Sequence, residues 1–112
     1  MEIVKYVFDL TKQFPEIEKY TLRSQMVRAA VSIPSNIAEG TSRSSSKDFA
    51  RYLEIALGSC FELETQLLIS EFSRLAESYD FSVLTELIQD EQKMIHSFIR
   101  KVVPKGQHET SN

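Results

Sequence analysis

This 112-residue sequence has few of the residues that build disulfide-linked or β-rich proteins. It contains one cysteine, three glycines, three prolines and no tryptophan. A single cysteine cannot form a disulfide within the chain, so nothing points to an oxidising compartment. Glycine and proline supply most tight turns, and their scarcity disfavours a turn-rich β fold.

Long apolar runs and an excess of basic charge are also missing. No uncharged run reaches the roughly 18 residues that a membrane-spanning helix needs, and charged side chains interrupt the N-terminal segment. We therefore expect a cytoplasmic protein. Lys and Arg number 13 against 16 Asp and Glu, a formal net charge of −3. A protein that holds nucleic acid through its phosphates usually has a basic excess, so any such role needs a local patch or a partner.

What the sequence does contain is helical periodicity. Apolar residues recur at steps of three and four, which is the period of an amphipathic α-helix. Between Phe49 and Leu67 the spacing is a strict heptad seam. The four predicted helices run from about Ile3 to Phe14, Leu22 to Arg43, Lys47 to Leu75 and Ser82 to Val103.

Polar residues mark where these helices begin. Thr21 is placed to cap the second helix, Ser45 with Asp48 resembles a capping box before the third, and Asp80 or Ser82 precedes the fourth. Short connections between amphipathic helices predict an all-α, antiparallel up-down-up-down four-helix bundle over residues 1–104. Residues 105–112 are polar and have no periodicity, which predicts a disordered C-terminal tail.

Pro34 lies inside the second predicted helix. Proline has no N–H, so the carbonyl of Ala30 loses its helical partner and the ring crowds that turn. We expect a proline kink or a local break there. Gly40 and the serine-rich run that follows it are expected to end the helix.

One group of polar residues comes together if the second and third helices pack antiparallel about a turn near Ser45. Residues equally far from Ser45 then lie level, so Arg28 faces Glu62 and Ser32 faces Gly58. In the same way Asn36 faces Glu54, and Glu39 faces Arg51. The candidate constellation is Arg28, Ser32, Asn36, Glu39, Arg43, Arg51, Glu54 and Glu62.

The constellation has two interpretations that the sequence leaves open. In the structural one, Arg28 and Glu62 form a partly buried ion pair that fixes helix register. In the functional one, the members nearest the turn form a binding surface. Gly58 costs a helix about 1 kcal/mol relative to alanine. Close approach of the second and third helices at this level is the structural explanation for it, and a ligand site is the alternative.

Recognisable catalytic and metal-binding patterns are lacking. Cys60 has a heptad position and no neighbouring general base, so we predict a small core residue. His96 has no glutamate three residues before it, as a di-iron bundle requires, and the two histidines with one cysteine do not make a zinc site. The three glycines are too scattered to form a phosphate loop. We expect no cofactor and no enzymatic activity.

Two runs of sequence carry a family resemblance. Residues 24–40 read SQMVRAAVSIPSNIAEG, and residues 49–67 read FARYLEIALGSCFELETQL. With them the chain closely resembles the bacterial "four helix bundle protein" family, first noticed as reading frames within intervening sequences of large-subunit ribosomal RNA genes. A related protein is the accessory protein of diversity-generating retroelements, which works with a reverse transcriptase and nucleic acid.

The resemblance implies a four-helix bundle and a ring-like homo-oligomer, commonly a homopentamer. The related accessory protein has a basic surface, and this chain at −3 departs from it. The wide apolar stripes independently favour association, because Phe8, Tyr52, Phe61 and Phe72 flank the core seams. The first functional hypothesis is an oligomeric scaffold that binds RNA or a nucleic-acid enzyme. The second is a structural or regulatory protein-interaction module without nucleic-acid contact.

Overall fold

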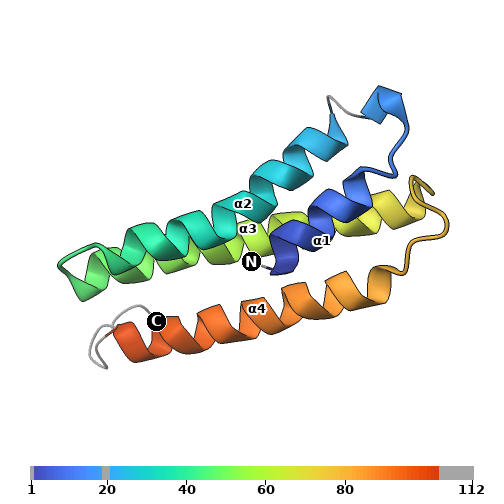
Figure 1. Cartoon of the computed structure of the whole chain (residues 1–112). Helices are drawn as coiled ribbons and strands as arrows, with labels where there is room; N and C mark the ends of the chain where they lie inside the picture. The colour runs from blue at the N-terminus through green and yellow to red at the C-terminus, as the bar shows by residue number, and fades with distance from the viewer. Residues whose placement is uncertain (1, 19–20, 104–112) are drawn as a thin grey trace.

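The computed structural model describes residues 2–18 and 21–103, and every long element in this part of the chain is a helix (Figure 1). A short 3₁₀ turn separates the first two long helices. The elements are α1 (Glu2–Thr11), η1 (Glu16–Glu18), α2 (Leu22–Thr41), α3 (Ser46–Phe72) and α4 (Phe81–Val102). The predicted tail, residues 105–112, lies outside the described residues.

The packing order confirms the predicted up-down-up-down bundle. Helix α2 packs against α3, α3 packs against α4, and α1 contacts both α2 and α4. The result is an elongated molecule of 49 × 22 × 21 Å, with α3 along most of its length (Figure 1). Because α3 has 27 residues and α1 only 10, α1 covers part of the bundle and begins near its middle.

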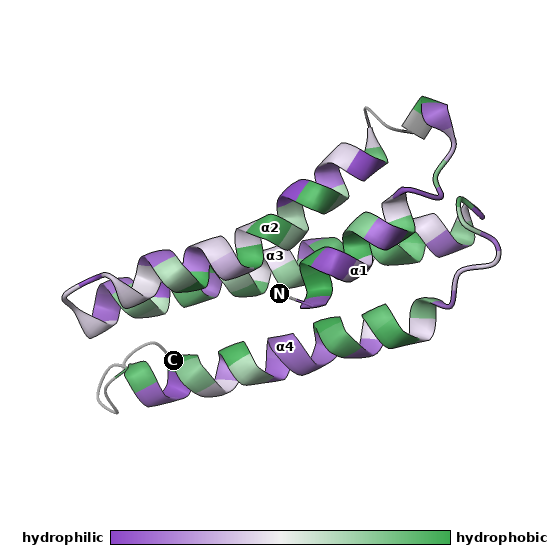
Figure 2. Ribbon diagram, viewed as in Figure 1, coloured by the Kyte–Doolittle hydropathy of each residue, from purple (hydrophilic) through white to green (hydrophobic). Residues whose placement is uncertain are grey.

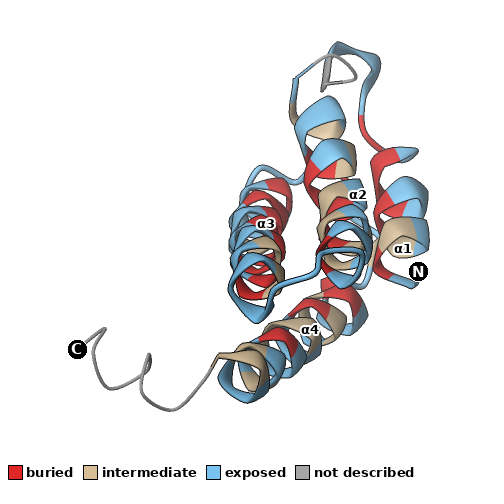
Figure 3. Cartoon of the chain, turned by 90° about the vertical axis from the view of Figure 1, so that its left-hand side faces the viewer, coloured by how far each residue is buried: buried red, intermediate tan, exposed pale blue. Residues whose placement is uncertain are grey.

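The amphipathic stripes face one another and form a continuous core. Leu10, Met26, Ile33, Leu63 and Ile88 are almost completely buried, one or more from each helix. Hydrophobic residues follow the inward faces of the helices, and buried positions gather between them (Figures 2 and 3).

Two of the predicted caps are confirmed. The Ser45 hydroxyl accepts a hydrogen bond from the Asp48 amide at 3.1 Å, which satisfies one free amide at the start of α3. Asp80 caps α4, and its carboxylate accepts from the Ser82 amide at 3.0 Å and from the Ser82 hydroxyl at 2.6 Å. These bonds hold the pKa of the Asp80 carboxyl below its usual range. Thr21 occupies the capping position of α2, but its side chain makes no capping hydrogen bond.

Three helices end two or three residues earlier than predicted, because local hydrogen bonds close them sooner. Helix α1 ends at Thr11, where tighter turns from Gln13 to Leu10 and from Phe14 to Thr11 replace the helical pattern. Helix α2 ends at Thr41 rather than Arg43, and the Ser42 hydroxyl bonds the carbonyl of Glu39 at 2.7 Å.

The end of α3 at Phe72 is a Schellman motif. The Arg74 amide bonds the carbonyl of Glu71 at 3.2 Å, and the Leu75 amide bonds the carbonyl of Ser70 at 3.1 Å. Arg74 has φ 57°, a left-handed conformation that usually belongs to glycine. No glycine marks this end in the sequence, so periodicity alone extended the prediction to Leu75.

Helix α2 runs without a break through Pro34. The expected local break is therefore wrong, and the kink stays a prediction. Gly40, expected to end this helix, lies inside it and is buried.

Candidate functional site

The centre of the α2–α3 hairpin is held by small polar side chains. The hydroxyls of Ser32 and Ser59 lie 2.8 Å apart, one residue from the predicted level of Ser32 with Gly58. The Asn36 amide nitrogen donates to the Ser32 carbonyl at 2.8 Å and to the Ser32 hydroxyl at 2.9 Å. Asn36 was expected level with Glu54 but is bound one turn earlier on its own helix. This part of the constellation joins the helices.

A second group gathers at the α2–α3 turn. Arg43 forms an ion pair with Glu39 and also donates to the Tyr52 hydroxyl at 2.9 Å. The guanidinium carbons of Arg43 and Arg51 lie 4.9 and 5.0 Å from the centre of the Tyr52 ring, so both arginines make cation–π contacts with it. We call Glu39, Arg43, Arg51 and Tyr52 the turn cluster. Glu39 therefore pairs with Arg43, two residues beyond the end of α2, and not with Arg51 as predicted.

Arg28 and Glu62 are not the partly buried pair that the structural interpretation required. Both side chains are exposed, and the described part of the chain contains no hydrogen bond or ion pair between them. Both charges lie on the outer surface, and the polar contact between the two helices at this level is the one between Ser32 and Ser59. The Gln66 amide donates a hydrogen bond to the Glu62 carboxylate at 3.5 Å, and Glu54 is exposed.

The two helical glycines have opposite surroundings. A Cβ atom on Gly40 would lie 2.8 Å from a ring carbon of Phe49 and 3.0 Å from Cβ of Tyr52, so this glycine allows a close approach of α2 and α3. A Cβ on Gly58 would meet nothing within 4 Å, and Gly58 is exposed. The expectation that Gly58 serves close packing of these helices is wrong, and Gly40 has that role.

An apolar groove opens between α2, α3 and α4 beside the turn cluster. Its volume is ≈ 500 Å³. Phe49 and Phe98 pack at its rim as a tilted pair with ring centres 6.3 Å apart. The lining residues are Ile37, Thr41, Phe49, Leu53, Glu91, Met94, Ile95 and Phe98.

Two ionisable groups near this groove are shifted by burial. Desolvation raises the pKa of the Glu91 carboxyl, the single charged residue that lines the groove. Cys60 is fully buried, and burial together with the carboxylates of Glu91 and Glu64 raises the pKa of its thiol to about 12. The prediction of a small core residue is confirmed, because the Cys60 side chain is inaccessible to solvent. A thiol with this pKa also stays protonated and is a poor nucleophile at neutral pH.

Large hydrophobic side chains remain exposed, as the wide stripes predicted. Phe72 is 90% exposed, Leu68 is 61% exposed, and Phe8 and Phe61 are also exposed. Tyr52 is half-buried. These side chains belong to two helices, Phe8 to α1 and the others to α3.

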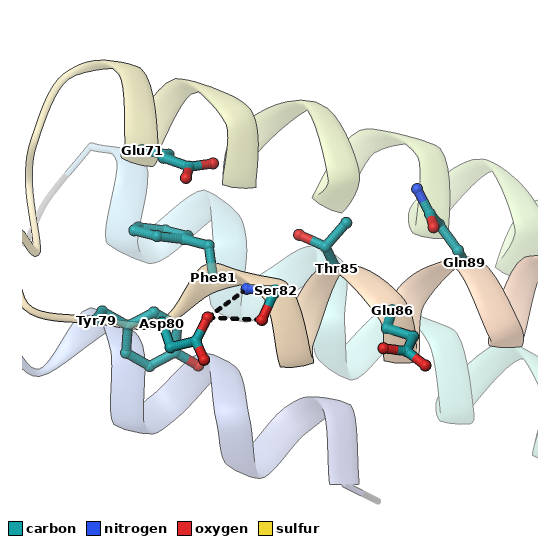
Figure 4. Close-up of a pocket in the computed structure, with 8 residues that line it drawn as sticks. All are labelled: Glu71, Tyr79, Asp80, Phe81, Ser82, Thr85, Glu86 and Gln89. Carbon is teal, nitrogen blue, oxygen red and sulfur yellow. Dashed lines mark hydrogen bonds between the residues drawn. The ribbon is translucent and has the colours of Figure 1, made fainter.

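A second hollow lies at the opposite end of the bundle, where α4 begins, and Figure 4 shows the residues that line it. Its volume is ≈ 560 Å³. Its charged lining residues are all acidic, namely Glu71, Asp80 and Glu86. The Asp80 carboxylate already accepts a hydrogen bond from the Ser82 amide as the cap of α4. This hollow is therefore unsuited to phosphate or another anion.

Within the described ranges, no group of three or more His, Cys, Asp or Glu residues is placed to hold a metal ion. None of the described helices combines the length and the apolar character needed to cross a bilayer. The helix order and packing define a four-helix-bundle protein. Its surface carries the turn cluster, the apolar groove and several exposed hydrophobic side chains.

The chain belongs to the 23S rRNA-intervening sequence protein family, whose model matches residues 1–97. A solved structure with the same fold is a protein with unknown function from the S23 ribosomal protein family of Bacteroides thetaiotaomicron VPI-5482. The two chains are 24% identical, each is covered over 88% of its length, and the TM-score is 0.74. Comparison with curated proteins gave no match.

Proposed function

We propose that this protein is a non-enzymatic, homo-oligomeric scaffold or accessory protein of the cytoplasm, and that its partner is RNA or an enzyme acting on nucleic acid. A ring of copies, as in the pentamers that the family resemblance implies, is part of the proposal. The buried thiol of Cys60 and the open, weakly polar groove support a binding role over catalysis.

The observation that carries the RNA contact is the turn cluster. Arg43 and Arg51 lie against Tyr52 at an exposed corner of the bundle. Unstacked RNA bases bind on aromatic rings and guanidinium planes, and arginine also binds phosphate through paired hydrogen bonds. A net charge of −3 gives little general attraction, so RNA would bind at this corner only. A homo-oligomer repeats the cluster and multiplies its effect.

The test is the solution mass by light scattering, with and without mixed cellular RNA at low salt. The homo-oligomer should gain mass with RNA and lose it as salt rises, because each phosphate contact releases counterions. Arg43→Ala/Arg51→Ala should abolish the gain. The matched control, Lys93→Ala/Lys101→Ala on α4, removes the same charge elsewhere and should keep it.

A wild-type oligomer indifferent to RNA at low salt would contradict the RNA contact. It would favour the alternative, a protein-interaction module without nucleic-acid contact. The observation that favours the protein-interaction module is the apolar groove, because Met94 and Phe98 offer side-chain surface to an apolar partner segment. Equal loss of RNA in the control variant would show general electrostatics rather than a site at the turn cluster.

A further inference from the structure

Two exposed strips run side by side along the outer surface of the α2–α3 hairpin. Each consists of residues spaced by three and four, so each lies on one face of its helix. The Ser32–Ser59 contact at 2.8 Å lies between them and fixes their relative level. The α2 strip is Arg28, Val31 and Ser35, and the α3 strip is Ile55, Gly58 and Glu62.

Each strip has one charged side chain, one exposed apolar side chain and one small residue. Arg28 and Glu62 carry opposite charges at the same level but do not pair with each other. Val31 is 40% exposed and Ile55 is 43% exposed, so each strip offers apolar side-chain surface to a partner. Among the described residues nothing lies within 4 Å of a Cβ on Gly58, which leaves room there for the backbone of a second copy.

The strips are complementary to each other in charge and shape. The α2 strip begins with a cation and continues with an apolar and a small residue. The α3 strip has an anion at the level of that cation, then a glycine, then an apolar residue. A second copy related by a two-fold axis parallel to the helices would lay its α2 strip over the α3 strip at the same level. Arg28 of each copy then lies over Glu62 of the other.

We infer that the outer face of the α2–α3 hairpin is the interface between copies of this chain. The α2 strip of one copy packs on the α3 strip of the next, with an Arg28–Glu62 ion pair between them. Gly58 lets the two backbones approach. The same contact closes a dimer when it is made twice, or a ring when each copy offers its α2 strip to one neighbour and its α3 strip to the other. This inference rests on the homo-oligomer of the proposed function and deepens it by naming the interface.

The charges select this arrangement over one in which α2 packs on α2. An antiparallel α2–α2 contact would place Arg28 opposite Glu39. Glu39, however, is already neutralised by Arg43 within its own chain, and Arg51 is held against Tyr52. Arg28 and Glu62 are the opposite charges at one level of this face that have no ion-pair partner among the described residues.

Charge reversal tests the pairing, with the dissociation constant measured by light scattering on dilution. Arg28→Glu and Glu62→Arg should each weaken association about tenfold or more, because each places like charges together. The double variant Arg28→Glu/Glu62→Arg restores an opposite pair and should return association to near wild type. Lys12→Glu, just after α1, and Glu86→Arg on α4 make the same charge changes elsewhere and should leave association unchanged.

A variant with a large side chain tests the close approach separately. The Cβ of Gly58→Leu meets no atom within 4 Å among the described residues, and leucine is a strong helix former, so helix content and thermal midpoint should be kept. Its association should nevertheless be lost. Retained association in this variant would overturn the close approach at Gly58.

The remaining outcomes separate the interface from the proposed function. A wild-type oligomer whose mass ignores both single reversals would overturn this interface and leave the homo-oligomer intact. Rescue of Arg28→Glu by Glu39→Arg, instead of by Glu62→Arg, would overturn the α2-on-α3 pairing. A wild-type monomer would overturn the interface and the oligomeric part of the proposed function together, whereas the RNA test bears only on the turn cluster.

Discussion

The two ends of the bundle share α2, α3 and α4 but differ in what covers the groove between α2 and α4. At the end near the α3–α4 loop, α1 fills the groove with Ile3, Val7 and Leu10, all nearly inaccessible to solvent. At the end near the α2–α3 turn, no described segment occupies it, and Met94 and Phe98 are 57% and 52% exposed. We call these the covered end and the open end.

The difference follows from helix length more than from chemistry. Both ends are lined by apolar side chains at helical spacing. Helix α1 has 10 residues and α3 has 27, which at about 1.5 Å per residue is a difference of roughly 25 Å. A short first helix therefore leaves an apolar surface that an equal-length bundle would bury.

The largest expected effect comes from truncating one apolar side chain at each end of the bundle. Leu10→Ala at the covered end should lower the free energy of unfolding by about 2–5 kcal/mol, because it leaves a cavity in a packed core. Phe98→Ala at the open end should cost about 1 kcal/mol or less, since half of its surface is already in water and mainly the Phe49 ring contact is lost. Urea unfolding of both variants measures the difference, and equal losses would contradict the distinction between the ends.

A tight contact at the open end gives the next effect. Gly40→Ala should destabilise the fold by about 1–2 kcal/mol, because overpacking against Phe49 and Tyr52 outweighs the gain in helix propensity. The control is Gly58→Ala, measured at concentrations where the chain is monomeric, which should stabilise by about 1 kcal/mol. If Gly40→Ala were as stabilising as its control, the close approach of α2 and α3 would be wrong.

Cys60 lies between the two ends. The pH dependence of unfolding that its thiol causes shows whether water is excluded from the middle of the core. Its folded pKa of about 12 is above the ordinary value of 9.0, so its contribution to stability is complete below about pH 9 and is lost as pH rises towards 12. The loss between pH 9 and 10 should be about 1 kcal/mol. Comparing the pH profile of unfolding with that of Cys60→Ala isolates this titration. Parallel profiles above pH 9 would show a thiol open to water.

The smallest effect concerns the carboxylate in the open groove. Desolvation raises the folded pKa of Glu91, so its contribution is present below the ordinary value of 4.5 and is lost as pH rises through the raised pKa. Glu91→Gln should therefore be more stable than wild type at pH 7, by less than about 1 kcal/mol because the group is partly solvated. The advantage should disappear below about pH 4.5. Glu86→Gln, at an exposed position of α4, is the control for the loss of one negative charge.

The polar constellation shows where sequence reasoning about sites reached its limit. The register argument placed α2 and α3 correctly to within one residue, as the Ser32–Ser59 contact shows. It could not choose partners, because side-chain direction decides them. Glu39 bonds Arg43, just after the end of its own helix, rather than Arg51 across the hairpin. The stacking of Arg43 on Tyr52, nine residues away, has no signal in either helical or heptad spacing.

The sequence by itself determined the helices, the bundle topology, the caps at Ser45 and Asp80 and the burial of Cys60. These features depend on apolar periodicity and on short-range hydrogen bonds, which local order encodes. Only the tertiary structure decided which glycine separates two backbones, which charges pair and where the apolar groove remains open. Those outcomes depend on the distances between helices and on how far α1 extends along them. Such distances follow from packing the whole core, and no single segment carries them.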